Sequence, residues 1–117
     1  MKWSKEKANS WYEEQPWLVG CNFLPSSAIN QLEMFQKDTF DQETIERELD
    51  WAKDLGFNSL RVYLHDLLWS EKEKFKKTFD RFLNICEKRN IKPIIVLFDD
   101  CHRPYPKLGK QPLPVKG

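Results

Sequence analysis

Three short stretches of the chain have the hydrophobic pattern of strands. The central stretch, residues 58–65, alternates three aliphatic residues with three polar ones, pairing Leu60, Val62 and Leu64 with Arg61, Tyr63 and His65. Successive side chains of a strand point to opposite faces, so one face of this strand is aliphatic and the other carries a guanidinium, a phenol and an imidazole. Residues 17–24 and 93–99 are nearly continuous apolar runs, which are typical of buried strands.

Longer stretches between these strands have the spacing of amphipathic helices. Residues 41–55 begin at a good N-cap, Asp41, and Gly56 is the expected C-terminal stop. Residues 70–89 begin with Ser70 and Glu73, which predict a capping box, and carry a stripe of phenylalanines. A further short helix is predicted over residues 4–15, with an apolar stripe and Ser4 as its N-cap.

The remaining segments show little regular pattern. Residues 28–39 read as a long loop, and the tail 101–117 is rich in proline and lysine with no helix or strand pattern. Gly20, inside the first apolar run, indicates that another backbone or a ligand passes close to it.

The order strand, helix, strand, helix, strand predicts an α/β fold with a parallel sheet and right-handed crossovers. Because a helix pattern flanks the central strand on each side, we expect both of its faces to be covered. Arg61 and His65 would then be enclosed near the carboxyl end of a parallel strand, where α/β proteins build their sites. The glycine-rich motifs of dinucleotide-binding folds and of P-loop proteins are both absent from the sequence.

Composition narrows the classes of partner. The chain has 117 residues and a formal net charge of +1, with basic and acidic residues interleaved, which argues against binding to nucleic acid. No apolar run is long enough to span a bilayer, and the N-terminus lacks the apolar core of a signal peptide. A cytoplasmic protein and a mature secreted chain would look the same. The three cysteines are widely spaced, which predicts free thiols and no zinc site.

A sheet of three strands would leave two apolar edges open, which favours aggregation. A (β/α)8 barrel needs about 250 residues, and this chain supplies about three of its eight units. We therefore expect a partial TIM barrel, made of the first three βα units of a longer enzyme, or a part that needs complementary chains.

Three stretches of the chain resemble the start of (β/α)8 glycoside hydrolases: WLVGCNFLPSSAINQLEMFQ, LGFNSLRVYLHDLLW and IIVLFDDCHRPYPKLGKQP. The resemblance covers most of the chain, from about Trp11 to Pro112, and is closest to bacterial 1,4-β-xylanase and cellulase-like proteins. These belong to the retaining clan that includes β-galactosidases, β-mannanases and endoglucanases. The most specific part of the resemblance is the set Asn58, Arg61 and His65, followed by Asp-Leu-Leu-Trp.

The resemblance implies hydrolysis of β-linked oligo- or polysaccharides with retention, without a metal or cofactor. Arg61 matches an arginine that lies beside the nucleophile carboxylate, and His65 matches a histidine that meets the sugar at the cleavage subsite. Both catalytic glutamates of the clan end later strands, beyond Gly117, so the fragment alone is expected to be inactive. Relatives carry an aromatic residue, usually Trp, where this chain has His102.

Each candidate residue also has a structural interpretation. Arg61 either orients a catalytic carboxylate or forms a structural ion pair. His65 either donates to a sugar hydroxyl or caps its loop. Asp99 and Asp100, which end the third strand, either accept hydrogen bonds from sugar hydroxyls or form a turn or helix cap.

Other candidates would complete a sugar site. Trp69 and Tyr105 could stack on sugar rings, although Trp69 could equally be core beneath the loop. Four polar residues at or after the end of the first strand are further candidate contacts: Asn22, Asn30, Gln31 and Glu33.

Two other functions fit the pattern less well. A receiver-like domain could use Asp99 as phosphoacceptor, but it needs an acidic cluster after the first strand, where this chain has Asn22 and apolar residues. A non-catalytic module could bind carbohydrate or a partner chain through the aromatic residues.

Overall fold

The computed structural model describes residues 2–100 and 104–116. The strands are β1 (Gly20–Asn22), β2 (Ser59–Tyr63) and β3 (Lys92–Val96), and they form one parallel sheet in the order β1-β2-β3. The α-helices are α1 (Lys5–Glu13), α2 (Gln31–Phe35), α3 (Gln42–Asp54) and α4 (Lys72–Lys88), and a 3-10 helix, η1, covers Asp66–Glu71. The expected α/β fold with three parallel strands is confirmed. No helix formed by the described residues is both long and apolar enough to cross a membrane.

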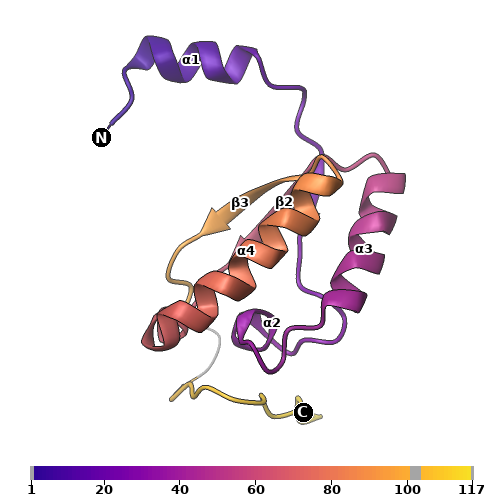
Figure 1. Ribbon diagram of the computed structural model, residues 1–117, viewed down its shortest axis with the longest axis vertical. Coiled ribbons are helices and arrows are strands. Elements are labelled where there is room, and N and C mark those ends of the chain that lie inside the picture. The colour runs from indigo at the N-terminus through magenta and orange to yellow at the C-terminus, as the bar shows by residue number, and fades with distance from the viewer. Residues whose placement is uncertain (1, 101–103, 117) are drawn as a thin grey trace.

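Helices α3 and α4 lie on the same face of the sheet and share one core with β2. In Figure 1, α4 crosses in front of the strands and α3 lies to the right of it. Strand order follows chain order, and right-handed crossovers therefore place both connecting helices on one side. The prediction that both faces of the central strand are covered is wrong for the described residues. Arg61 and Ile94, which pair in register on the other face, are both exposed, and this face is called the open face below.

The core fills the space between the sheet and helices α3 and α4. Leu60 and Val62 point into it from β2, and Ile45 and Leu49 enter from α3. Five phenylalanines form a continuous set of edge and stacked contacts, with ring centroids 5.5 to 6.4 Å apart: Phe23, Phe35, Phe75, Phe79 and Phe82. The phenylalanine stripe of α4 therefore lies in or against the core.

The two cysteines within the described residues are free thiols, as predicted, but their surroundings differ. Cys86 is fully buried in the core, and burial raises the pKa of its thiol to about 12, because an apolar environment disfavours the thiolate. Cys21 is exposed on β1. Cys101 lies outside the described residues.

Strand β1 is shorter than residues 17–24, and a side chain extends its pairing. Asn58 accepts a hydrogen bond from the Val19 N–H through Oδ1 and donates one to the Trp17 carbonyl through Nδ2, each 2.8 Å long. The amide of Asn58 thus takes the place of a peptide group before β1 begins. The close approach predicted at Gly20 is confirmed, because a Cβ atom there would lie 1.9 Å from the carbonyl oxygen of Ser59.

Helix α3 begins as predicted, since Asp41 accepts a hydrogen bond from the Thr44 N–H. The start of the next helix was predicted incorrectly. Ser70 belongs to η1 and donates its hydroxyl to the Leu67 carbonyl, and α4 begins two residues later without a side-chain cap. The first strand and the third strand also end earlier than predicted, at Asn22 and Val96.

The predicted loop over residues 28–39 contains α2, whose five residues are all buried. Asn30 caps this helix by accepting a hydrogen bond from the Glu33 N–H. A helix of five residues is too short for its hydrophobic spacing to be recognised in the sequence.

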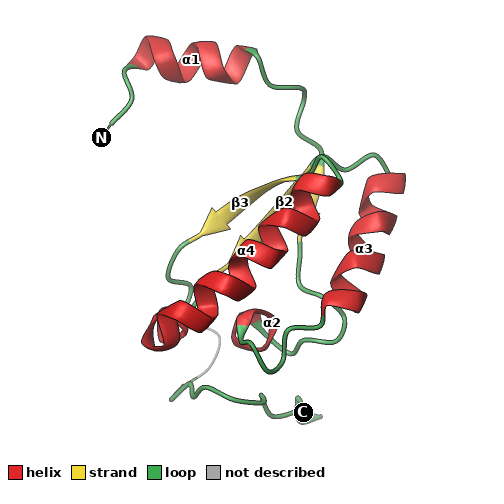
Figure 2. Cartoon of the chain, viewed as in Figure 1, coloured by secondary structure: helices red, strands yellow, loops and turns green. Residues whose placement is uncertain are grey.

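Helix α1 is present as predicted, and Ser4 accepts a hydrogen bond from the Lys7 N–H. All residues from Lys2 to Glu14 are exposed, however, so the predicted apolar stripe is not covered within the described part of the chain. Figure 2 shows α1 projecting away from the sheet and its helices.

Candidate functional site

The carboxyl ends of β1 and β2 border a hollow of about 460 Å³. Its lining combines amide side chains, a phenol and apolar groups, and carries no carboxylate among the described residues: Asn22, Phe23, Leu24, Ile29, Asn30, Gln31, Met34 and Tyr63. Three of the predicted contacts, Asn22, Asn30 and Gln31, are therefore brought together with Tyr63. Amides and aromatic rings can bind sugar hydroxyls and sugar faces, whereas the hollow lacks the acidic groups that a receiver-like metal site requires.

Arg61 lies next to this hollow on the open face. Its Nε donates a hydrogen bond to Oδ1 of Asn22 at 2.7 Å, and its guanidinium carbon lies 5.4 Å from the centre of the Tyr63 ring. Among residues 2–100 and 104–116, no carboxylate lies within ion-pair distance of the guanidinium. The alternative interpretation of Arg61 was a structural ion pair, and this part of the chain offers no carboxylate to form it.

His65 follows β2 and is buried. Its Nδ1 accepts a hydrogen bond from the Leu67 N–H at 3.2 Å, which caps η1, and also lies 2.9 Å from Oδ1 of Asp66. One nitrogen cannot accept from the peptide and donate to a carboxylate at the same time. In its neutral, accepting form His65 therefore has the loop-capping role, and the structure supplies a role for it without a sugar.

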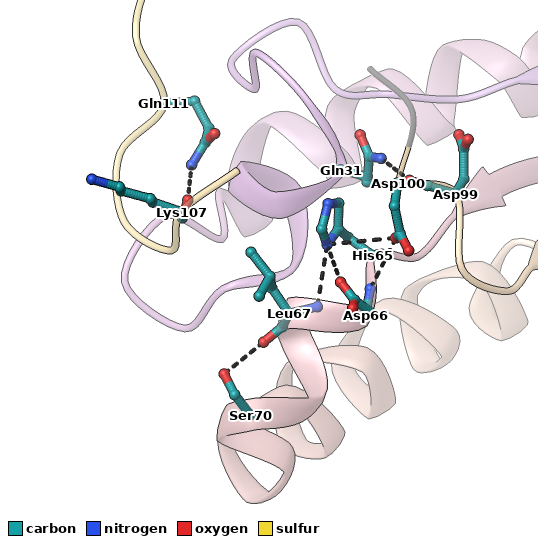
Figure 3. A network of polar contacts seen from close by, with 9 residues as sticks. All are labelled: Gln31, His65, Asp66, Leu67, Ser70, Asp99, Asp100, Lys107 and Gln111. Atoms are coloured by element: carbon teal, nitrogen blue, oxygen red, sulfur yellow. Dashed lines mark hydrogen bonds and ion pairs between the residues drawn. The ribbon is translucent and has the colours of Figure 1, made fainter. Parts of the chain in front are cut away.

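Asp100 connects the ends of β2 and β3. Figure 3 shows its carboxylate directed at the His65 loop, where Oδ1 accepts from the Asp66 N–H at 3.2 Å and lies 3.6 Å from Nδ1 of His65. The side chain of Asp99 points away from the imidazole. The backbone of Asp99 forms two hydrogen bonds: its N–H donates to the Leu64 carbonyl at 2.8 Å, and its carbonyl accepts from Nε2 of Gln31 at 2.6 Å.

His65, Asp66 and Asp100 bring one nitrogen and two carboxylate oxygens within 4.8 Å of one another. Such a set could hold a divalent cation. The hydrogen bonds within the loop already account for the placement of all three groups, and no metal role is assigned to them.

Glu33, the fourth predicted contact, and Asn30 hold the C-terminal tail. Glu33 accepts a hydrogen bond from the Gln111 N–H at 3.0 Å, and the side chain of Asn30 donates to Oε1 of Gln111 at 3.0 Å. Gln111 is buried, and its amide also donates to the carbonyls of Lys107 and Gly109. The tail has no helix or strand in its described part, as predicted, but Gln111 anchors it over α2.

Trp69 lies in a different place from the other candidates. It lines a groove of about 590 Å³ on the helix-covered face, beside α4, and its ring is more than half exposed with Nζ of Lys76 5.6 Å from its centre. The structure does not bring Trp69 to the hollow beside Arg61. Tyr105 is almost fully exposed, and His102 lies outside the described residues.

Sequence reasoning missed several residues that shape the site. Asp66 was not singled out, and neither was Gln111, which is 78 residues away in the chain from the Glu33 side chain that it meets. Asn58 was noted only as part of the resemblance. Its position as the first, polar residue of the predicted strand was the only signal for its role.

Comparison of the chain with models of protein families, with curated proteins and with solved structures gives no match.

Proposed function

We propose that this chain is the N-terminal part of a (β/α)8 retaining glycoside hydrolase and that its open face contributes to binding a β-linked oligo- or polysaccharide. The observation that supports this most is Arg61. It is held by Asn22 on the open face, with no carboxylate partner among the described residues. A guanidinium in this position can receive a carboxylate from another strand by a bidentate bond.

The sheet geometry supports the same proposal. Three strands in chain order, with both crossover helices on one side, are what three consecutive units of a (β/α)8 barrel would have. In such a barrel the open face would line the interior, and the hollow at the carboxyl ends of β1 and β2 would belong to the catalytic end. The remaining strands would have to come from elsewhere.

Retaining hydrolysis needs two carboxyl groups about 5 to 5.5 Å apart on either side of the scissile bond. In the proposed assignment neither comes from these 117 residues. Arg61 would keep the nucleophile ionised and oriented, because a guanidinium beside a carboxylate favours its charged form. The isolated chain would bind sugar weakly and would not hydrolyse it.

Sugar binding by the isolated chain tests the proposal. We expect xylotetraose or cellotetraose to shift the amide NMR signals of Asn22, Tyr63 and their neighbours, while maltotetraose, which is α-linked, shifts none. In the isolated chain no described carboxylate pairs with the guanidinium, so Arg61 can donate to a sugar hydroxyl there. Arg61→Ala should therefore weaken binding by about tenfold, the effect of losing one hydrogen bond to a charged group, and Arg61→Lys should weaken it less.

Two results would contradict the proposal. One is that neither β-linked sugar shifts any signal near the hollow at the highest soluble sugar concentration. The other is that the purified chain hydrolyses an aryl β-glycoside at a rate that Arg61→Ala leaves unchanged. Binding that Arg61→Ala does not affect would favour a non-catalytic binding module instead.

A further inference from the structure

Two parts of this molecule present apolar surface that the described chain leaves uncovered. The first is the groove beside α4, which residues of η1 and of α4 line together. Its floor is almost entirely apolar and is formed by residues of α4 and of the segment after β3: Phe75, Phe79, Leu83, Leu97 and Phe98. Leu97 and Phe98 are more than 60% exposed, at 63% and 68%.

Phe98 makes the groove an unusual surface. Its φ is +58°, a left-handed conformation that costs a bulky residue free energy, and its ring is nevertheless exposed. Exposed phenylalanine held in such a conformation suggests a surface that is covered in the functional state. Asp66, Lys76 and Asp80 add charged groups to the lining of the groove.

The second uncovered part is α1. Trp3 and Trp11 pack edge to face with ring centroids 6.2 Å apart, and Nζ of Lys7 lies 4.6 Å from the centre of the Trp3 ring. Both tryptophans are 48% exposed. Helix α1 and Trp3, just before it, therefore present two aromatic rings and a cation together on one surface. The rings match the apolar floor of the groove, and Lys7 is opposite in charge to Asp66 and Asp80, which outnumber the single lysine of the lining, Lys76.

Helix α1 cannot reach the groove of its own chain without breaking contacts. Asn58 holds Trp17 and Val19 at the amino end of the sheet, which leaves residues 14–16 as the linker. Three residues span at most about 10 Å. The groove lies along the first half of α4, at the opposite end of the sheet, and a 17-residue helix is about 25 Å long.

We propose that the groove beside α4 binds α1 of a second copy of this chain. In a two-fold arrangement the amino end of one copy lies beside the carboxyl end of the other, so each α1 meets the partner's groove. A buried aromatic side chain removes about 150 to 250 Å² from water, so each contact is smaller than a standard interface of about 1,600 Å². The dimer is therefore weak and depends on both contacts. The inference applies to the 117-residue chain by itself, because in the proposed barrel the unit after β3 would pack beside α4. Its test involves no sugar, so the two proposals can fail separately.

Sedimentation velocity of the full 117-residue chain over a range of concentrations tests this inference. We expect reversible dimers in the wild type and a loss of at least about tenfold in association constant for Trp11→Glu and for Leu97→Glu. Trp51→Glu and Leu55→Glu are matched controls, because both change exposed apolar residues at the other connecting helix, α3 and its C-cap, and should leave association unchanged. Circular dichroism shows whether each variant is folded.

Mixing variants separates this arrangement from any other dimer. Trp11→Glu keeps an intact groove and Leu97→Glu keeps an intact α1, so an equal mixture can form one of the two contacts. The mixture should associate more strongly than either variant alone and less strongly than the wild type. A wild type that remains monomeric at all concentrations overturns the inference, and so does dimerisation that the α1 and groove variants reduce no more than the controls do.

Discussion

Replacing Asn58 by alanine removes two hydrogen bonds that hold the residues before β1 against the start of β2. One joins Oδ1 to the Val19 N–H and the other joins Nδ2 to the Trp17 carbonyl, each at 2.8 Å. Alanine keeps the backbone bond from the N–H of residue 58 to the Val19 carbonyl, at 2.9 Å. The substitution thus tests the side-chain amide alone.

The expected loss follows from the exposure of the two partners. A hydrogen bond within a protein contributes about 0.5 to 1.5 kcal/mol net, so two of them contribute about 1 to 3 kcal/mol. Val19 is 41% exposed and Trp17 is 84% exposed, so water can replace the amide at both sites. We therefore expect a decrease of about 1 to 2 kcal/mol in the free energy of unfolding, without a further desolvation cost.

Asn58→Asp separates the two bonds. A carboxylate still accepts from the Val19 N–H but cannot donate to the Trp17 carbonyl, so about half of the effect should remain. Urea unfolding followed by circular dichroism gives the free energy for each variant. Hydrogen exchange of the Val19 amide gives the local effect, with protection lost in Asn58→Ala and kept in Asn58→Asp.

Asn84→Ala is the matched control, since the Asn84 amide makes a single 3.3 Å bond on the exposed surface of α4. It should change the free energy of unfolding by less than about 0.5 kcal/mol. Two outcomes would refute the reasoning. One is that the Val19 amide exchanges as slowly in Asn58→Ala as in the wild type. The other is that the Val19 amide exchanges as fast in Asn58→Asp as in Asn58→Ala.

Three further predictions concern the core and the helix faces. Phe82→Ala should lower the free energy of unfolding by about 3 to 5 kcal/mol in urea unfolding, because Phe82 is fully buried among aromatic rings; a loss below about 1 kcal/mol would contradict this. The pKa of the Asp50 carboxyl is lowered, chiefly by its hydrogen bonds with Arg89. The ionised carboxylate therefore contributes its full share to the stability of the fold above the unfolded pKa of about 3.9. That contribution is lost as the pH falls through the lower folded pKa. Asp50→Asn should therefore be less stable than wild type at pH 7, with the difference closing on acidification and not on raising the pH. Maleimide labelling read by peptide mass spectrometry should modify Cys21 in the folded protein and Cys86 only after denaturation, because Cys86 is buried and its pKa is raised to about 12; equal labelling would count against the described core.

The repeating elements could be predicted because their sequence signals are local. Asp41 precedes the periodic stripe of α3, and the alternation around Arg61 marks β2 in residues only a few positions apart. Parallel pairing followed from the order of the elements. The error about the covered faces arose from the same order. The two helices that flank β2 in the sequence were assumed to lie on opposite faces of the sheet, whereas consecutive right-handed crossovers place both helices on the same face.

The candidate site was predicted less completely, because its contacts join distant parts of the chain. Asn22 meets Arg61 across two strands, and this pair could be anticipated from strand ends that share an edge. Nothing local to Gln111 indicates that it meets Glu33, and nothing local to Trp69 indicates that η1 turns it toward the helix-covered face. Such residues are placed by tertiary packing, which a single sequence does not display.

Gly20 has a consequence for how this chain can vary. A methyl group at that position would overlap the backbone of Ser59, which has no flexible end that could move aside. The neighbouring Cys21 is exposed and meets no such limit. Two adjacent codons should therefore differ sharply in the substitutions that they tolerate. A spectroscopic label attached to Cys21 would sit on a strand whose distance from β2 is fixed by its neighbour, and would report changes in its surroundings while the strand itself stays in place.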